Sequence, residues 1–271
     1  MGRLLIHAGF HKTGTTSVQR LLAKNKRVLA PLTHVFLRKH LDAACDAARA
    51  YSASRKASDL LAFSAAIAEF LEQRNLEDSR DIIISTEDLS GLMPGRRDLR
   101  SYDAAPILMK ALTMMIDRTV GDHFDEVIFY FSLRKPAPWL RSCHTQHLRA
   151  IRMTLDEADY AREYADSANL PRIVDKVRIA AAPHRVESAW LEDCADAPLG
   201  PLTPIADLLG WPEATRDALN MLPPANVSLP PELRAEFLEI NRATEDHDEM
   251  RKAKEAARRR HGKARPETAK H

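Results

Sequence analysis

The stretch from Leu4 to Leu22, LLIHAGFHKTGTTSVQRLL, constrains the fold more than any other part of the chain. Its apolar start is typical of a buried strand, a turn bounded by Gly9 and Gly14 follows, and apolar residues at helical spacing come next. This order predicts a loop that cradles an anion, because the start of a helix offers unpaired backbone N–H groups and the positive end of its dipole. Glycine lets the backbone approach the anion closely.

The side chains of this loop fit the same role. A cation and several hydroxyl donors lie within a few residues: Lys12, Thr13, Thr15, Thr16 and Ser17. The spacing from Gly9 to Gly14 matches the first part of the nucleotide-triphosphate loop G-x-x-x-x-G-K-[ST], but Thr15 stands where that pattern requires lysine. The lysine is instead Lys12, two residues before the second glycine. A turn that merely caps a helix is the plain alternative.

Three later segments are expected to complete a sheet with the first strand. Residues 81–86, DIIIST, contain three β-branched residues in a row, which is typical of a strand buried on both faces of a parallel sheet. Residues 126–133, EVIFYFSL, read as a central strand, and residues 184–190 form a weaker candidate. Residues 31–40 read as a connecting segment. The pattern predicts an α/β fold of three layers, P-loop-like, with a central parallel sheet flanked by helices and with helical insertions.

Glu87 follows the second predicted strand. Because open α/β sheets bind ligands at the carboxyl ends of their strands, Glu87 is expected at the same edge as Lys12. A carboxylate in that place is suited to act as a general base on a hydroxyl. Two other roles remain open for Glu87, which are capping the next turn and pairing with an arginine. Asp88 is the better candidate for a structural partner.

A second motif begins where the third predicted strand ends. Arg134 opens the sequence RKPAPWLRS, and Ser142 stands eight residues later, about two turns into the next helix. An arginine at a strand end and a serine at that distance can converge on one phosphate, the first through a charged fork and the second through a hydroxyl.

The two motifs together resemble those of sulfotransferases that use 3′-phosphoadenosine 5′-phosphosulfate (PAPS) as donor, with the first motif reading H-K-T-G-T-T-S in this chain. The resemblance covers roughly residues 1–150. It implies that Lys12 contacts the phosphosulfate, that Gly14, Thr15 and Thr16 hold the 5′-phosphate, and that Arg134 with Ser142 holds the 3′-phosphate. Several carbohydrate sulfotransferases of this kind use glutamate as the base, which implies the same role for Glu87.

These roles define an expected enzyme. The donor site is expected to comprise His11, Lys12, Thr13, Gly14, Thr15, Thr16, Ser17, Arg134 and Ser142, and the catalytic residues are expected to be Lys12 and Glu87. PAPS is the expected donor and adenosine 3′,5′-bisphosphate (PAP) the product. The expected acceptor is a hydroxyl of a carbohydrate, a glycolipid or another small molecule. No metal is expected, since His144 and His147 lie one turn apart without an evident third ligand.

Two other classes of function remain open. A P-loop kinase of small molecules would need Asp88 as its Mg²⁺ ligand and would have to dispense with lysine at position 15. A nucleotide-binding module without catalysis would keep the donor pocket but not the transfer.

Composition sets the remaining expectations. A chain of 271 residues with 45% hydrophobic residues suits one α/β domain, expected over residues 1–248. Residues 251–271 carry nine Lys and Arg against two Glu, a charge of +7, which leaves −5 on residues 1–250. Residues 249–271 are therefore expected to form a basic tail, either a solvated helix that frays or an arginine-bearing segment over the donor, and nucleic acid is not an expected partner.

The three cysteines and the N-terminus point to a compartment. Cys45, Cys143 and Cys194 are odd in number and share no CxxC spacing, so neither a disulfide framework nor a zinc cluster is expected. The first apolar segment is too short for a signal peptide or a membrane helix. A soluble protein of the cytoplasm without a membrane span is expected, and the sequence does not indicate its oligomeric state.

Overall fold

The structure, a computed structural model, describes residues 1–73, 79–223 and 229–263, and by its internal contacts the chain divides into two compact units. The first unit comprises residues 1–136 and 166–225, and the second comprises residues 137–165 and 226–271. The expected division into 1–248 and 249–271 stays a prediction, and the compact units are bounded differently.

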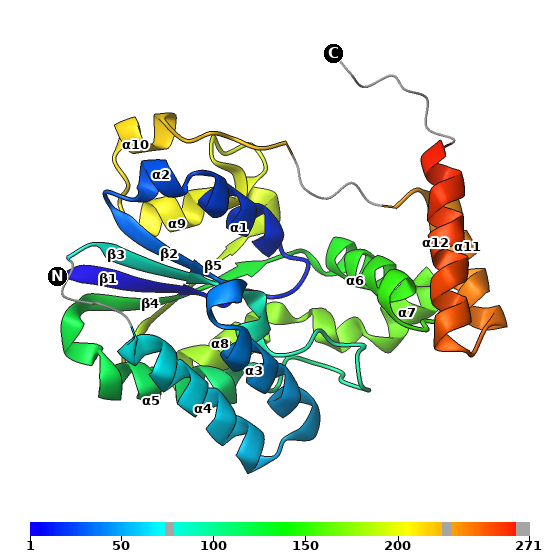
Figure 1. Cartoon of the computed structure of the whole chain (residues 1–271), viewed down its shortest axis with the longest axis horizontal. Helices are drawn as coiled ribbons and strands as arrows, with labels where there is room; N and C mark the ends of the chain where they lie inside the picture. The colour runs from blue at the N-terminus through cyan, green and yellow to red at the C-terminus, as the bar shows by residue number, and fades with distance from the viewer. Residues whose placement is uncertain (74–78, 224–228, 264–271) are drawn as a thin grey trace. The chain divides into compact units, whose positions relative to one another are not determined.

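The first unit is built on a parallel sheet. Its strands are β1 (Gly2–His7), β2 (Thr33–Leu37), β3 (Asp81–Ser85), β4 (Phe124–Leu133) and β5 (Arg185–Trp190). They pair in the order β2-β3-β1-β4-β5, and every pairing is parallel (Figure 1). This arrangement confirms the expected fold class.

The strand β2 corrects one expectation. The segment 31–40 contains this five-residue strand in place of a plain connection. β2 lies at the edge of the sheet and pairs with β3 alone, from Thr33 opposite Asp81 to Leu37 opposite Ser85. The strand partner of β2 lies about 48 residues away in the sequence. The amino-acid pattern of residues 33–37 therefore indicates a strand only weakly.

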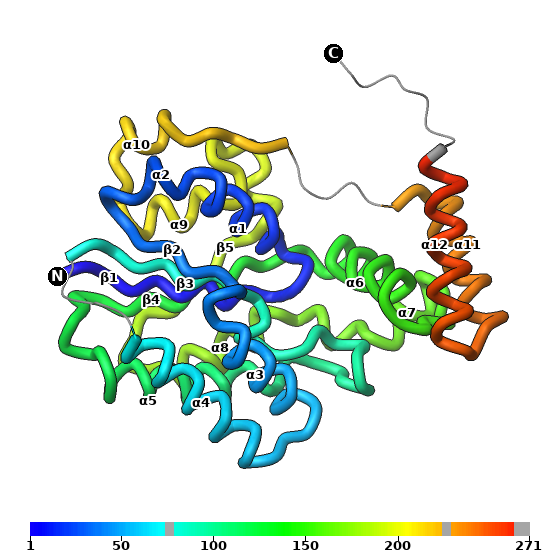
Figure 2. The backbone as a smooth tube through the Cα atoms, viewed as in Figure 1, coloured from blue at the N-terminus to red at the C-terminus, as the bar shows by residue number. Residues whose placement is uncertain are grey.

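Helices cover both faces of this sheet, as Figures 1 and 2 show. One face carries α1 (Thr15–Lys24), α2 (Lys26–Leu29), α9 (Thr203–Leu208) and α10 (Glu213–Asp217). The other carries α3 (Asp42–Ser54), α4 (Ala57–Glu72), α5 (Ala105–Thr119) and α8 (Leu170–Ala180). Short 3₁₀ turns connect them: η1 (Arg38–His40), η2 (Glu87–Ser90), η3 (Gly121–His123), η4 (Ala165–Ala168), η5 (Leu191–Cys194) and η6 (Gly200–Leu202).

The helix α1 owes its place to an apolar stripe. Val18, Leu21 and Leu22 are buried at spacings of three and four residues, against a core that includes Leu5 of β1 and Ile128 of β4. Burial of this stripe fixes the start of α1 over the carboxyl end of β1. The loop between them is thereby held at one edge of the sheet.

The second unit is helical. It contains α6 (Pro136–Ala150) from its second residue on, α7 (Glu157–Glu163), α11 (Pro231–Ala243) and α12 (His247–Lys263). Asn241 of α11 is fully buried and donates to the carbonyls of Leu148 and Met153. The side chain of Lys254 of α12 is buried and donates to the carbonyl of Ile151 over 3.0 Å.

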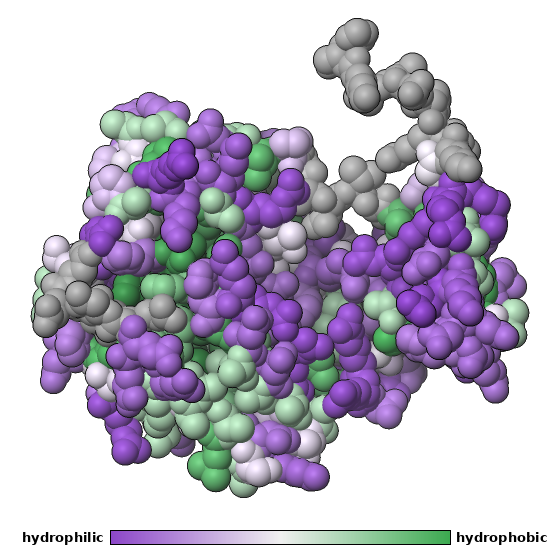
Figure 3. Space-filling view, viewed as in Figure 1, coloured by the Kyte–Doolittle hydropathy of each residue, from purple (hydrophilic) through white to green (hydrophobic). Residues whose placement is uncertain are grey.

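The helix α12 covers most of the segment expected to be a basic tail. Met250 and Ala257 are buried, so the helix has an inner face, although Figure 3 shows its visible surface as largely hydrophilic. Arg260 pairs with Glu236 of α11 and Arg258 lies 5.5 Å from the ring centroid of Phe237. The fraying that was expected further on concerns residues 264–271, which lie outside the described residues.

Candidate functional site

The loop after β1 lies at the topological switch point of the sheet. The connection that leaves β1 runs toward β2, whereas those that leave the neighbouring strands β3 and β4 run toward β5. Ligands of open α/β sheets bind at the carboxyl edge at such a point. The topology therefore makes residues 8–17 the first candidate for a ligand site.

The backbone of this loop requires its two glycines. Gly9, Lys12 and Gly14 all have positive φ, at 47°, 69° and 95°. A Cβ on Gly9 would lie 2.7 Å from Thr15 Cγ2, and a Cβ on Gly14 would lie 2.8 Å from Leu191 Cδ1. The loop thus turns tightly enough to bring the first turn of α1 back over the strand.

Side-chain hydrogen bonds hold three carbonyls of the loop. Ser90 donates to the Gly9 carbonyl over 2.8 Å, Thr13 donates to the Phe10 carbonyl over 2.6 Å, and Arg134 Nη1 donates to the Lys12 carbonyl over 3.0 Å. The N–H groups of Ser17 and Val18 bond the Gly14 carbonyl over 3.0 and 3.2 Å, which leaves those of Thr15 and Thr16, at the start of α1, without partners inside the helix. Those groups are suited to an anion.

A buried polar chain under the loop was missed in the sequence. Thr13 Oγ1 lies 2.8 Å from Ser132 Oγ, His7 Nε2 lies 3.2 Å from Ser132 Oγ, and His7 Nδ1 lies 2.9 Å from Ser85 Oγ. Because the Thr13 hydroxyl already donates to the Phe10 carbonyl, it accepts from Ser132. Ser132 then accepts from His7 Nε2–H, and His7 Nδ1 accepts from Ser85.

The charge state of His7 agrees with that chain. His7 is fully buried, and burial lowers its pKa from 6.5 to about 3. A neutral ring with one N–H is what the hydrogen-bond direction requires. The ends of β1, β3 and β4 and the loop are thereby tied together by one uncharged network.

Glu87 stands at the start of η2, which begins two residues after the last residue of β3. Its side chain is half-buried, and its Oε2 accepts a hydrogen bond from Gln19 Nε2 of α1 over 2.6 Å. The carboxylate is thus held against the helix that follows the loop, as expected for strands β1 and β3 that are neighbours in the sheet. Its catalytic role stays a prediction.

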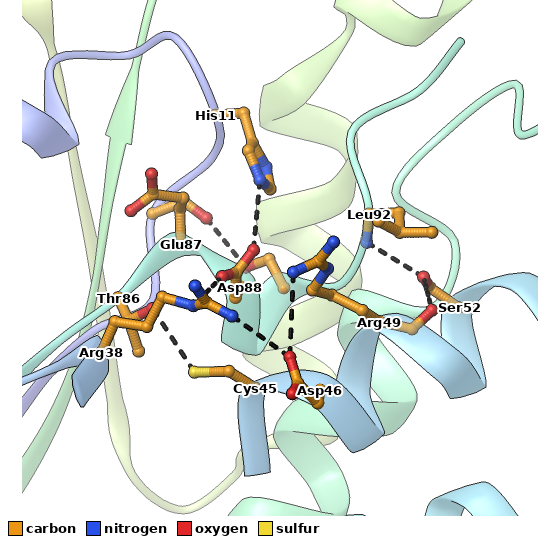
Figure 4. A network of polar contacts seen from close by, with 12 residues as sticks. His11, Arg38, Cys45, Asp46, Arg49, Ser52, Thr86, Glu87, Asp88 and Leu92 are labelled. Atoms are coloured by element: carbon orange, nitrogen blue, oxygen red, sulfur yellow. Dashed lines mark hydrogen bonds and ion pairs between the residues drawn. The ribbon is translucent and has the colours of Figure 1, made fainter. Parts of the chain in front are cut away.

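Asp88 is the residue that pairs with cations. Its Oδ2 lies 2.7 Å from Arg38 Nε, and its Oδ1 lies 3.4 Å from His11 Nε2, which brings the loop and the ends of β2 and β3 together (Figure 4). Burial opposes ionisation of Asp88, but the hydrogen bond and charge of His11 with the charges of Arg38 and Arg49 outweigh it, so its pKa is lowered. Of the two neighbouring carboxylates, Asp88 is therefore the one that pairs with an arginine of the fold, which is the structural role that the sequence favoured for it.

The other residues of Figure 4 form the surroundings of this pair. Asp46 of α3 pairs with Arg38 over 3.1 Å and with Arg49 over 3.8 Å. Cys45 Sγ lies 3.6 Å from Thr86 Oγ1, and burial raises the pKa of the Cys45 thiol to about 11. A thiol of this kind is protonated and unreactive at neutral pH.

The remaining expected donor residues divide between the units. Thr15 is buried, Ser17 is half-buried and Thr16 is exposed, all in the first turn of α1. Arg134 follows β4 in the first unit, and Ser142 lies on α6 in the second. The structure thus brings Arg134 to the loop, and the pairing of Ser142 with it stays a prediction.

The histidines of α6 contact groups of the protein itself. Within the parts of the chain that the structure describes, no three His, Cys, Asp or Glu residues are placed to hold a metal ion. His144 Nε2 donates to the Leu155 carbonyl over 2.9 Å, and His147 lies 3.1 Å from the Tyr160 hydroxyl. No helix among the described residues has the length and apolar character needed to cross a bilayer.

No protein-family model matches the chain, and no curated protein matches it in sequence. Among solved structures, a sulfotransferase from Alicyclobacillus acidocaldarius aligns with 95% of this chain and 99% of its own, at 14% identity and a TM-score of 0.45. The identity and the TM-score are both too low to indicate a function.

Proposed function

We propose that the protein is a sulfotransferase that moves a sulfuryl group from PAPS to an acceptor hydroxyl. The observation that carries the proposal is the hydrogen bond from Arg134 to the Lys12 carbonyl. It joins the two motifs that resemble the donor site of this family, although they stand 122 residues apart in the chain. A loop alone is compatible with many nucleotides, whereas this pair fits a nucleotide with phosphates at both ends of its ribose.

The donor would be held by the loop and by Arg134. The N–H groups at the start of α1, with Lys12, Thr15 and Thr16, would bind the 5′-phosphosulfate. The hydroxyl of Thr13 is used inside the protein, so this residue would act through the shape of the loop. The Arg134 fork would bind the 3′-phosphate, with Ser142 as the second ligand that the motif predicts.

The transfer itself would be largely electrostatic. Glu87 would take the proton of the acceptor hydroxyl, whose oxygen attacks sulfur while the bond from sulfur to the bridging oxygen of the 5′-phosphate breaks. Charge builds on the bridging oxygen that leaves with PAP, and Lys12 would stabilise it. A single preorganised donor of this type typically lowers a barrier by roughly 3–4 kcal/mol.

The kinase alternative gains no support from the site. The residue it needs as a Mg²⁺ ligand, Asp88, is engaged by Arg38 and His11. The loop also places Thr15, which is buried, where the kinase pattern has its lysine. The acceptor class, a carbohydrate, glycolipid or other small hydroxyl, remains a prediction from the resemblance.

The proposal is tested by following PAP release from PAPS. Wild-type protein should release PAP with water or with an alcohol from a panel of sugars, phenols and simple alcohols. Lys12→Met should lower the rate by about two orders of magnitude or more. Lys24→Met, at the exposed end of α1, should not change it. Inert PAPS together with Mg²⁺-dependent transfer from ATP would contradict the proposal.

A further inference from the structure

A hydrogen bond links the helix of the anion loop to the proposed base. Gln19 Nε2 donates to Glu87 Oε2 over 2.6 Å. Gln19 stands four residues after Thr15, on the same side of α1, and side chains of helices lean toward the N-terminus. The amide of Gln19 is therefore carried back toward the loop and meets Glu87 at the end of β3.

The two neighbouring carboxylates have different partners. Asp88 is paired with Arg38 and lies near His11, as Figure 4 shows, whereas Glu87 accepts a hydrogen bond from Gln19. Within the described residues, Gln19 is the only side chain that hydrogen-bonds the Glu87 carboxylate, and no cation pairs with it. The chain thus gives a charged partner to one carboxylate and a neutral partner to the other.

The neutral partner suits a base. A cation on Glu87 would stabilise its charge strongly and weaken it as a proton acceptor. A neutral amide N–H restricts rotation of the carboxylate without adding a positive charge, and it occupies Oε2, so that Oε1 remains for the proton of an acceptor. Fixing a reacting group in one geometry raises the rate of its step.

We propose that Gln19 is a positioning residue for the general base Glu87. This inference rests on the proposed function. The proton of the acceptor O–H bond passes to Glu87 Oε1, the acceptor oxygen bonds to sulfur, and the bond from sulfur to the 5′-phosphate breaks with its electron pair on PAP. Gln19 takes no part in bond making and acts by holding Glu87.

The test replaces Gln19 by leucine, which has a similar size and no donor. The measured quantities are kcat and the KM for PAPS, from PAP release with water and with the alcohol that raises the rate most. Gln19→Leu should lower kcat by roughly tenfold, the value of one oriented hydrogen bond, and leave the KM for PAPS within about twofold.

Gln73→Leu is the matched control. Gln73 also donates to a glutamate, with Nε2 3.0 Å from Glu69 Oε1, but it lies exposed after α4. This variant makes the same change to the same kind of pair and should leave kcat unchanged. Equal kcat values for Gln19→Leu and Gln73→Leu would overturn the inference.

A double-mutant cycle separates positioning from a general structural effect. If Gln19 acts through Glu87, adding Gln19→Leu to Glu87→Gln should cause no further loss of kcat. Losses that multiply in the double variant would overturn the inference. In the folded protein, the NMR signal of the Gln19 side-chain amide should shift in Glu87→Gln and stay in place in Asp46→Asn, whatever the activity.

Failure of the inference and failure of the proposed function have different signatures. Calorimetry with PAP reports the donor site without any transfer. PAP binding with active PAPS turnover and an unaltered Gln19→Leu would remove the role of Gln19 alone. PAP binding without turnover by the wild type would remove both Glu87 as base and Gln19 as its positioning residue, and leave a donor site. Absence of PAP binding would remove the proposed function itself.

Discussion

The hydroxyls of Thr13 and Ser132 lie 2.8 Å apart and join the anion loop to the end of β4. Ser132→Ala would remove this link and leave the N–H of buried His7 without its acceptor. We expect a loss of about 1–3 kcal/mol in the free energy of unfolding, measured by urea denaturation. Ser64→Ala, whose hydroxyl donates only to a carbonyl of its own helix α4, should change stability far less. Equal losses in the two variants would show that the network does not stabilise the loop.

The buried His7 predicts how stability depends on pH. Its pKa is about 3 in the folded protein, below the ordinary value of 6.5, because burial disfavours the charged ring. The unfolded chain therefore binds more protons between these values, and stability falls as the pH falls below about 6.5. Between these two pKa values, His7 alone changes the free energy of unfolding by ~1.4 kcal/mol per pH unit.

The measurement is a series of urea denaturations between pH 4.5 and 7. The dependence of the free energy of unfolding on pH should be weaker in His7→Gln, by ~1.4 kcal/mol per pH unit. His123→Gln, in the exposed turn η3, should retain the wild-type slope. A His7→Gln protein with an unchanged slope would mean that His7 titrates normally in the folded state.

Gly14 should be required for donor binding. Its φ is +95°, and a Cβ would lie 2.8 Å from Leu191 Cδ1. Gly14→Ala should therefore shift the first turn of α1 and weaken PAP binding by roughly tenfold or more, because several N–H groups move at once. Gly210→Ala is the control, since Gly210 also has a positive φ, of +51°, with nothing within 4 Å of its added Cβ.

Both glycine variants should lose stability through the backbone strain, by roughly 1–2 kcal/mol. Calorimetry with PAP should distinguish them, because only Gly14 lies at the loop. Equal PAP affinities in the two variants would mean that the loop does not bind the donor.

Asp88 should stabilise the fold. Asp88→Asn removes the ion pair with Arg38 and the contact with His11, and we expect a loss of about 1–3 kcal/mol in the free energy of unfolding. Because the pKa of Asp88 is lowered, this contribution is present above its unfolded pKa of 3.8 and is lost as the pH falls toward the folded value. Asp46→Asn, the exposed partner of the same arginine, should cost much less. A metal-dependent activity that disappears in Asp88→Asn would favour the kinase instead.

Much of the sheet was readable because its central strands are locally distinctive. The apolar runs at residues 81–86 and 126–133 correspond to β3 and β4, and the glycine spacing after β1 predicted a tight loop. β2 was missed because a five-residue edge strand is stabilised by pairing with β3 and not by its own pattern. Because the strands are parallel, the segments that carry Lys12, Glu87 and Arg134 all follow strand ends at one edge of the sheet.

The supporting contacts were not readable in the same way. His7 and Ser85 are register partners of neighbouring strands, and nothing in either segment alone specifies that pairing. Polar residues at the ends of two apolar strands were the available signal. Gln19 lies in an ordinary amphipathic helix, and its contact with Glu87 spans 68 positions. The grouping of α6 with α11 and α12 likewise depends on contacts between segments far apart in the sequence.

The most direct test of the donor class is calorimetric titration with PAP and, separately, with ADP plus Mg²⁺. Arg134→Ala removes the proposed 3′-phosphate ligand, Arg134→Lys keeps the charge without the fork, and Arg172→Ala is an exposed control on α8. The wild type and Arg172→Ala should prefer PAP, and Arg134→Ala should lose about 10- to 100-fold in PAP affinity, with Arg134→Lys between them. Tighter, Mg²⁺-dependent binding of ADP that does not respond to Arg134 would contradict the proposal that the chain is a PAPS-dependent sulfotransferase.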